Sequence, residues 1–242
     1  METRNKLFQI AILLYPGVTA LDAIGPWEVL WRMPNTEVRF VGKELEPVST
    51  EGGVLLLGVT HTLAETPSPD LVLVPGGSTT PGQMVDDDVL DWLREVSKTS
   101  TWTTSVCTGS LILGAAGILK GTPATSHWYK INVLRILGAK PEPDKRIVHS
   151  GKIVTAAGVS SGIDLALWLA ANIAGREQAE AIQLVIEYDP HPPFEAGRMS
   201  KASEKVRNLA KKMMDEIVPA DQRRLVPKIA WRRFIDFLRT RR

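Results

Sequence analysis

The 242-residue sequence contains a single cysteine, Cys107, and only four histidines. One thiol cannot close an intramolecular disulfide, so the disulfide-stapled folds of small secreted proteins are excluded. One thiol also cannot build a thiolate zinc cage, and the histidines lie in separate segments without metal-ligand spacing. We therefore predict no metal site and expect a cytoplasmic protein.

Long hydrophobic runs and nucleotide-binding loops are missing as well. Residues 163–174 form an apolar stretch interrupted by Asp164, whereas a membrane-spanning helix needs roughly 20 apolar residues. The first twenty residues have no small-residue cleavage site of a signal peptide. No G-x-G-x-x-G or Walker-type loop follows a strand, so no dinucleotide or nucleoside triphosphate is expected. These absences predict a protein that works without a cofactor and outside membranes.

Charge is unevenly distributed along the chain. From Ser200 to Arg242 there are 13 Lys/Arg and 5 Asp/Glu, a net charge of +8, which leaves −6 for residues 1–199. We therefore divide the chain into an α/β domain, 1–199, and a basic helical extension, 200–242. A basic extension can bind nucleic acid, but it can equally dock on its own acidic domain or on a second subunit, and we favour docking.

Apolar patterning predicts alternating strands and helices. Short β-rich runs at 7–15, 37–43, 53–57, 70–74 and 102–106 predict strands, and residues 146–156 predict a hairpin. Helical spacing is predicted at 22–33, 86–97, 108–119, from Trp128 onward, and twice within 161–187. This alternation predicts a doubly wound, mostly parallel sheet with helices on both faces.

Two segments near the C-terminus complete the expected organisation. Residues 187–197 are proline-rich and predict a loop. A last helix is expected at 221–240, with Ala230, Phe234, Phe237 and Leu238 on one apolar face. That face must be buried against another surface, which disfavours a free tail.

The segment SVCTGS, residues 105–110, places Cys107 between a predicted strand and a predicted helix. Helix N-termini carry unpaired N–H groups and a partial positive charge, so we expect a lowered pKa for this thiol. The small neighbours Ser105, Thr108, Gly109 and Ser110 fit the tight turn of a nucleophile elbow. The alternative is that Cys107 is a small buried hydrophobic residue.

Further residues could assist a nucleophilic thiol. Asp22 follows the first strand and should lie at the same sheet edge, although it could instead only cap its helix. The N–H groups of Gly76, Gly77 and Thr108 could stabilise an oxyanion, although Pro75-Gly76-Gly77 could be a plain turn. His127 could act as a base, or it could be structural.

Five motifs together resemble the ThiJ/PfpI superfamily, which has a class I glutamine amidotransferase-like fold. They are LLYPGVTALDAIGPWEVL, LVPGG, TSVCTGSLILGAAGILKGTPATSHW, AAGVSSGIDLALWLA and IEYDPHPPFEAG, within residues 6–200. Within the superfamily, the sequence is most similar to the isonitrile hydratase type. That resemblance implies homodimers and a flavodoxin-like sheet, whereas the basic extension is longer than the family's usual C-terminal helix.

The resemblance also assigns roles to residues. It implies that Cys107 is the nucleophile, that the Asp22 carboxyl is hydrogen-bonded near it, and that Thr108 supports the site. It makes the N–H groups of Gly77 and Thr108 the oxyanion donors, and it leaves His127 dispensable. The homodimer contact is expected at the helix of Trp27 and Trp31 and at the terminal helix.

The expected activity is hydration of an isonitrile, a small-molecule substrate, to an N-substituted formamide through a cysteine thioimidate. One alternative is another cysteine hydrolase or a glyoxalase-like enzyme of the superfamily. A second alternative is a ligand-sensing or redox-sensing regulator. Such regulators add a helix-turn-helix module of around 100 residues, and the extension of about 40 residues is too short for one.

Overall fold

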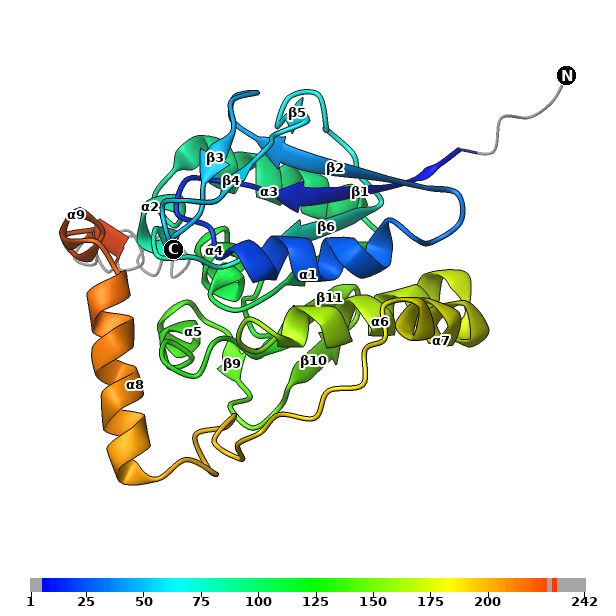
Figure 1. Ribbon diagram of the computed structural model, residues 1–242. Helices are drawn as coiled ribbons and strands as arrows, with labels where there is room; N and C mark the ends of the chain where they lie inside the picture. The colour runs from blue at the N-terminus through cyan, green and yellow to red at the C-terminus, as the bar shows by residue number, and fades with distance from the viewer. Residues whose placement is uncertain (1–5, 226–227, 230–242) are drawn as a thin grey trace, which may run out of the picture.

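The computed structural model describes residues 6–225 and 228–229. Its centre is a seven-stranded sheet with the strand order β10-β11-β7-β6-β1-β2-β5 (Figure 1). The strands run parallel except β10, which pairs antiparallel with β11. Their bounds are β1 Phe8–Leu13, β2 Thr36–Gly42, β5 His61–Thr62, β6 Leu71–Val74, β7 Trp102–Ser105, β10 Ile147–Ser150 and β11 Ile153–Ala156.

The central strands of this sheet are apolar because helices cover both of their faces. All four residues of β6 are buried, and so are the last four of β1. Helices α1 and α6 pack together on one face, while α3 lies behind the sheet in Figure 1. The predicted doubly wound α/β fold is therefore confirmed. The larger helices are α1 Ala20–Leu30, α3 Asp87–Thr99, α4 Gly109–Ala115, α6 Ser161–Ala174, α7 Arg176–Val185 and α8 Glu204–Ile217.

Two predicted elements differ from the structure. The strand predicted at 53–57 is reduced to β4, Leu56–Leu57, which pairs with β3, Val48–Ser49, in a separate hairpin. Gly52 and Gly53 form the turn of this hairpin, and the apolar residue after them, Val54, stays 93% exposed instead of joining the main sheet. The helix predicted from Trp128 is also shorter than expected. Residues 128–132 form turns, and the short helix α5 covers only Val133–Ile136.

The basic extension begins with α8, which lies along the side of the domain in Figure 1. Tyr129 donates a hydrogen bond to the Asp215 carboxylate of α8. The short helix α9, Ala220–Arg223, contacts the short helix α2, Thr80–Gln83. There the Gly82 N–H donates to Gln222 Oε1 at 2.9 Å. The extension therefore joins two distant loops of the domain.

The protein also contains a second small sheet. This sheet pairs β8, Pro123–Ala124, with β9, Lys140–Pro141. The residues proposed for the apolar face of the last helix, Ala230 to Leu238, lie outside the described residues. Within the described part of the chain, no helix is long and apolar enough to cross a membrane.

Candidate active site

Cys107 lies directly between β7 and α4, at the carboxyl edge of the parallel sheet. Its backbone φ is +59°, a left-handed value that a non-glycine residue adopts at some energetic cost. Three hydrogen bonds hold this conformation: the Cys107 N–H donates to Ala157 O at 2.7 Å, and its carbonyl accepts from Ser126 Oγ and Ser110 Oγ. The turn thus has the strained geometry of a nucleophile elbow.

Gly109, the second residue after Cys107, has no room for a side chain. A Cβ at this position would lie 1.9 Å from the carbonyl oxygen of Val74 in the neighbouring strand β6. No rotamer change can relieve a clash with backbone, so only glycine lets α4 start this close to the sheet. The helix start beside Cys107 therefore depends on the glycine of the TGS sequence.

Asp22 reaches the same edge of the sheet from the first turn of α1. The N-cap of that helix is Thr19, so the alternative of Asp22 as a simple cap is not what the structure has. The Asp22 side chain is fully buried, and its Oδ2 accepts the Gly76 N–H at 2.9 Å. Its other oxygen, Oδ1, is buried without a hydrogen-bond partner in the described residues. A buried carboxyl with an uncommitted oxygen is costly, which favours a functional role.

The strands before Asp22 and Cys107 are not neighbours, because β6 lies between β1 and β7. The two residues are linked through the turn Pro75-Gly76-Gly77 at the end of β6, because the Gly76 N–H donates to Asp22 and Gly76 lies against Thr108. A Cβ on Gly76 would lie 2.4 Å from Thr108 Oγ1 and 3.1 Å from Asp22 Oδ2. The glycine of this turn therefore makes room for both groups.

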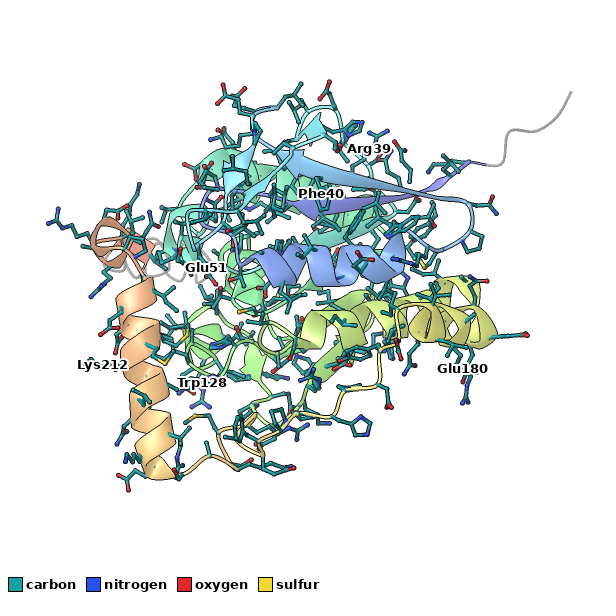
Figure 2. All side chains as sticks on the ribbon, in the orientation of Figure 1. Arg39, Phe40, Glu51, Trp128, Glu180 and Lys212 are labelled. Carbon is teal, nitrogen blue, oxygen red and sulfur yellow. The ribbon has the colours of Figure 1, made fainter. Side chains whose placement is uncertain are left out.

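Burial raises the pKa of Asp22 to about 7, against an ordinary value of 3.8. The Gly76 N–H and the Cys107 thiol act in the opposite direction, and the charge of Glu51 adds to the rise. Figure 2 labels Glu51 near the start of α1, where it accepts a hydrogen bond from Thr19 Oγ1. Asp22 can therefore both accept and donate a proton near neutral pH.

The expectation of a lowered thiol pKa is not met. Burial raises the pKa of Cys107 well above its ordinary value, and the negative charge of Asp22 raises it further. The backbone N–H groups of Val159 and Thr108 interact with the sulfur and lower the pKa, but burial is the larger effect. The Cys107 thiol accordingly keeps its proton, in place of a free thiolate, and Asp22 changes its protonation state near pH 7.

Thr108 contributes its two polar groups in different directions. Its N–H faces the Cys107 sulfur, whereas its hydroxyl lies 2.8 Å from the Thr80 hydroxyl. Thr80 Oγ1 donates to Gly77 O at 2.8 Å, so the Thr108 hydroxyl is the donor between the two threonines. The Gly77 N–H points back at both hydroxyl oxygens, at 3.2 Å each.

This threonine network bears on the predicted oxyanion donors. The N–H of Gly76 is bonded to Asp22, and that of Gly77 is bonded to Thr80 and Thr108. The oxyanion role of these two N–H groups stays a prediction, and it requires them to exchange their present partners. Thr80 was missed by sequence reasoning because nothing in the pattern STTPG marks a threonine that turns inward.

His127 is buried, at 8% exposure, and its Nδ1 accepts a hydrogen bond from the Tyr129 N–H at 3.4 Å. Burial lowers its pKa to about 4, so the imidazole is neutral at physiological pH. It packs on Gly158, where a Cβ would lie 2.5 Å from the ring. Among the described residues it makes no hydrogen bond to Cys107, so a base role for it stays a prediction.

Tyr15 is a second residue that sequence reasoning missed. It ends the apolar run of β1 at Tyr15-Pro16-Gly17, is 3% exposed, and donates a hydrogen bond to Pro75 O at 2.9 Å. Burial raises its pKa well above the ordinary value, so it remains a neutral donor that anchors the turn before Gly76. The only sequence signal is a tyrosine at the end of a buried strand, where its hydroxyl needs a partner.

The family model for the DJ-1/PfpI family matches residues 8–172, which is more than half of the chain and includes Asp22, the Pro75–Gly77 turn and Cys107. The chain belongs to the DJ-1/PfpI family. The predicted superfamily is thereby confirmed.

Proteins similar to this chain include one named as an enzyme and one named as a transcriptional regulator. The chain is 43% identical over 204 residues to an isonitrile hydratase of Pseudomonas putida, an alignment covering 84% of this chain and 89% of that protein. It is 31% identical over 177 residues to the HTH-type transcriptional regulator CdhR of Pseudomonas aeruginosa, covering 69% of this chain but 51% of the regulator. The family thus holds both an enzyme and a regulator similar to this protein.

Solved structures agree with the family assignment. A ThiJ/PfpI family protein from Pseudomonas syringae superposes with a TM-score of 0.85 at 35% identity, covering 93% of this chain and 90% of that one. Drosophila melanogaster DJ-1beta superposes with a TM-score of 0.69 at 22% identity, covering 76% of this chain and all of that one. The second likeness shows the shared fold alone.

Proposed function

We propose that this protein hydrates isonitriles to N-substituted formamides, with Cys107 as the nucleophile and Asp22 as the acid-base group. The observation that carries the proposal is the buried pair itself: an elbow cysteine interacting with a carboxyl whose pKa is raised to about 7. The 43% identity to the Pseudomonas putida isonitrile hydratase supports this choice of reaction.

In the first step, the sulfur of Cys107 attacks the terminal carbon of the isonitrile, R–NC. Asp22 takes the thiol proton as the C–S bond forms and delivers it to the same carbon. The product is a thioimidate, R–N=CH–S–Cys107, and Asp22 is again ionised. A carboxyl with a pKa near 7 suits this exchange, because at neutral pH it accepts and releases a proton with similar ease.

In the second step, water adds across the C=N bond of the thioimidate. Asp22 accepts a water proton and passes it to the nitrogen, which gives R–NH–CH(OH)–S–Cys107. Collapse of this adduct forms the C=O bond, breaks the C–S bond and returns a proton to the sulfur. The sum is R–NC plus water giving R–NH–CHO, with no electrons left over and no cofactor required.

The proposal also covers the cellular location, the domain division and the oligomeric state of the protein. The cytoplasmic location and the division at residues 199 and 200 stay predictions. A homodimer is also proposed, because α1 presents the exposed apolar side chains of Leu21 and Trp31 at its surface. The exposed face of α8 adds a second apolar stripe, formed by Val206, Leu209, Met213 and Ile217.

The decisive experiment measures loss of the infrared isonitrile stretch together with formamide formation. Wild type and Cys107→Ala are compared on aliphatic and aromatic isonitriles, with circular dichroism as the control for folding. We expect turnover by wild type and a loss of at least about a thousandfold in Cys107→Ala, because the thioimidate cannot form. Comparable turnover by a folded Cys107→Ala protein would refute covalent catalysis.

The regulator alternative is favoured by one observation, the similarity to CdhR. The matched part is 51% of that protein, so the comparison leaves half of the regulator without a counterpart here. A gel-shift measurement at low salt separates the alternatives. Binding that weakens steeply with salt and disappears on deletion of residues 221–242 would support the regulator, and no binding would support the enzyme.

A further inference from the structure

A cavity of about 300 Å³ lies next to the candidate active site and is not used by the mechanism above. Its inner wall is the turn Ala157–Ser160 after β11, together with Ser126, His127 and Trp128. Trp128 is labelled in Figure 2 beside α5. Loop residues 143–146 and 197–200 complete the lining. The last of these segments follows the proline-rich loop, a motif that the proposed reaction leaves unexplained.

His127 supplies this cavity with a neutral hydrogen-bond donor. Its Nδ1 accepts from the Tyr129 N–H, so the ring proton is on Nε2. Nε2 makes no hydrogen bond among the described residues, and the residue as a whole is 8% exposed. An imidazole N–H without a protein partner in the wall of a cavity is a group to which a ligand oxygen can bind.

The outer rim of the cavity carries basic side chains. Lys145 and Arg198 are exposed there and make no side-chain ion pair within the described residues. Arg146 is already neutralised by Asp164, and Asp144 adds one negative charge. With Asp164 counted against Arg146, the charges around the cavity sum to +1, beside the apolar surfaces of Trp128 and Met199. That combination fits a monoanion with an apolar body better than a dianion or a cation.

We infer that this cavity binds a small organic carboxylate, held by Lys145, Arg198 and the Nε2–H of His127. The site is coupled to Cys107 through its wall. The Cys107 N–H donates to Ala157 O, and the Val159 N–H interacts with the Cys107 sulfur. A ligand packed against Gly158 and Val159 holds this segment against the Cys107 sulfur. The bound ligand therefore restricts the access of reagents to that sulfur. The inference does not depend on the proposed reaction.

Benzoate is a suitable probe, because it combines one carboxylate with an apolar ring, and benzamide is its neutral control. Binding is measured by titration calorimetry on the full-length protein. Access to the sulfur is measured by the rate of iodoacetamide alkylation, which reports on Cys107 alone because the chain has no other thiol. Each assay is run on wild type, Lys145→Gln, Arg198→Gln and the control Lys140→Gln, whose exposed cation does not line the cavity.

We expect benzoate to bind with a dissociation constant on the order of 1 mM, as small ligands do, and benzamide at least about tenfold more weakly. Lys145→Gln and Arg198→Gln should each weaken benzoate about fivefold, while Lys140→Gln should not. In wild type, saturating benzoate should slow alkylation at least about threefold, and this ratio should shrink in the two rim variants.

Three outcomes would overturn the inference. One is the absence of saturable benzoate binding, and another is equal affinity for benzoate and benzamide. The third is slower alkylation that persists unchanged in Lys145→Gln and Arg198→Gln, which would place the probe at the sulfur itself. Circular dichroism on each variant confirms that a lost effect is not a lost fold.

Discussion

Asp22 is a single buried residue whose ionisation lowers the stability of the fold. In the folded protein it holds its proton up to about pH 7, whereas in the unfolded chain it releases it near 3.8. Between these values the folded state binds more protons than the unfolded state, so stability falls as the pH rises. The cost levels off above pH 7, where both states are ionised.

Asp22→Asn removes this titration. A tenfold change in proton affinity corresponds to about 1.4 kcal/mol. The free energy of unfolding of Asp22→Asn, relative to that of wild type, should therefore rise by up to about 4 kcal/mol between pH 4 and pH 8. Urea unfolding at several pH values measures it. The same substitution should lower kcat at least about a hundredfold, since general acid-base catalysis is lost. A stability difference that does not change with pH would contradict the burial argument.

At the scale of elements, side chains near the end of α8 and in α9 hold the extension to the domain. Burial and the Asp215 partner raise the pKa of Tyr129 to about 12, so its hydroxyl stays protonated and donates to α8 at neutral pH. Tyr129→Phe should remove about 0.5–1.5 kcal/mol from this docking, which speeds amide exchange in Glu204–Ile217 by about two- to tenfold. Amide exchange in α6 is the internal reference, and unchanged exchange in α8 would show that other contacts hold the helix.

Elements with strong local patterns were predicted well. The buried strands of the sheet centre, the 146–156 hairpin and the helix pair divided by Gly175 all match within a few residues. The failures at 53–57 and after Trp128 have a common cause. Both are short apolar runs whose state depends on partners in the fold: Leu56 and Leu57 pair with a local hairpin strand, and Ile136 remains exposed at the surface.

At the scale of the whole molecule, the exposed apolar surface is most simply explained by self-association. Trp31 is 47% exposed at the end of α1 and stacks on Trp27 at 5.9 Å between ring centres. Sedimentation velocity should show a dimer for wild type and a shift toward monomer for Trp31→Glu, because a buried unpaired carboxylate opposes association. Leu184→Glu, at an apolar residue of α7 that is 80% exposed, is the control. A monomeric wild type would refute the homodimer.

The sequence by itself predicted the strand-to-helix turn at Cys107, the family and the sheet, because each depends on residues close together in the chain. The elbow around Cys107 needs only its small neighbours, and the strands need only their apolar runs. Tertiary structure decided the electrostatics. It raised the thiol pKa instead of lowering it, brought Asp22 to Gly76 across 54 residues, turned the Gly77 N–H toward two threonines and placed the Val159 N–H at the sulfur. Burial and long-range hydrogen bonds arise only when distant segments pack, so no local pattern could reveal them.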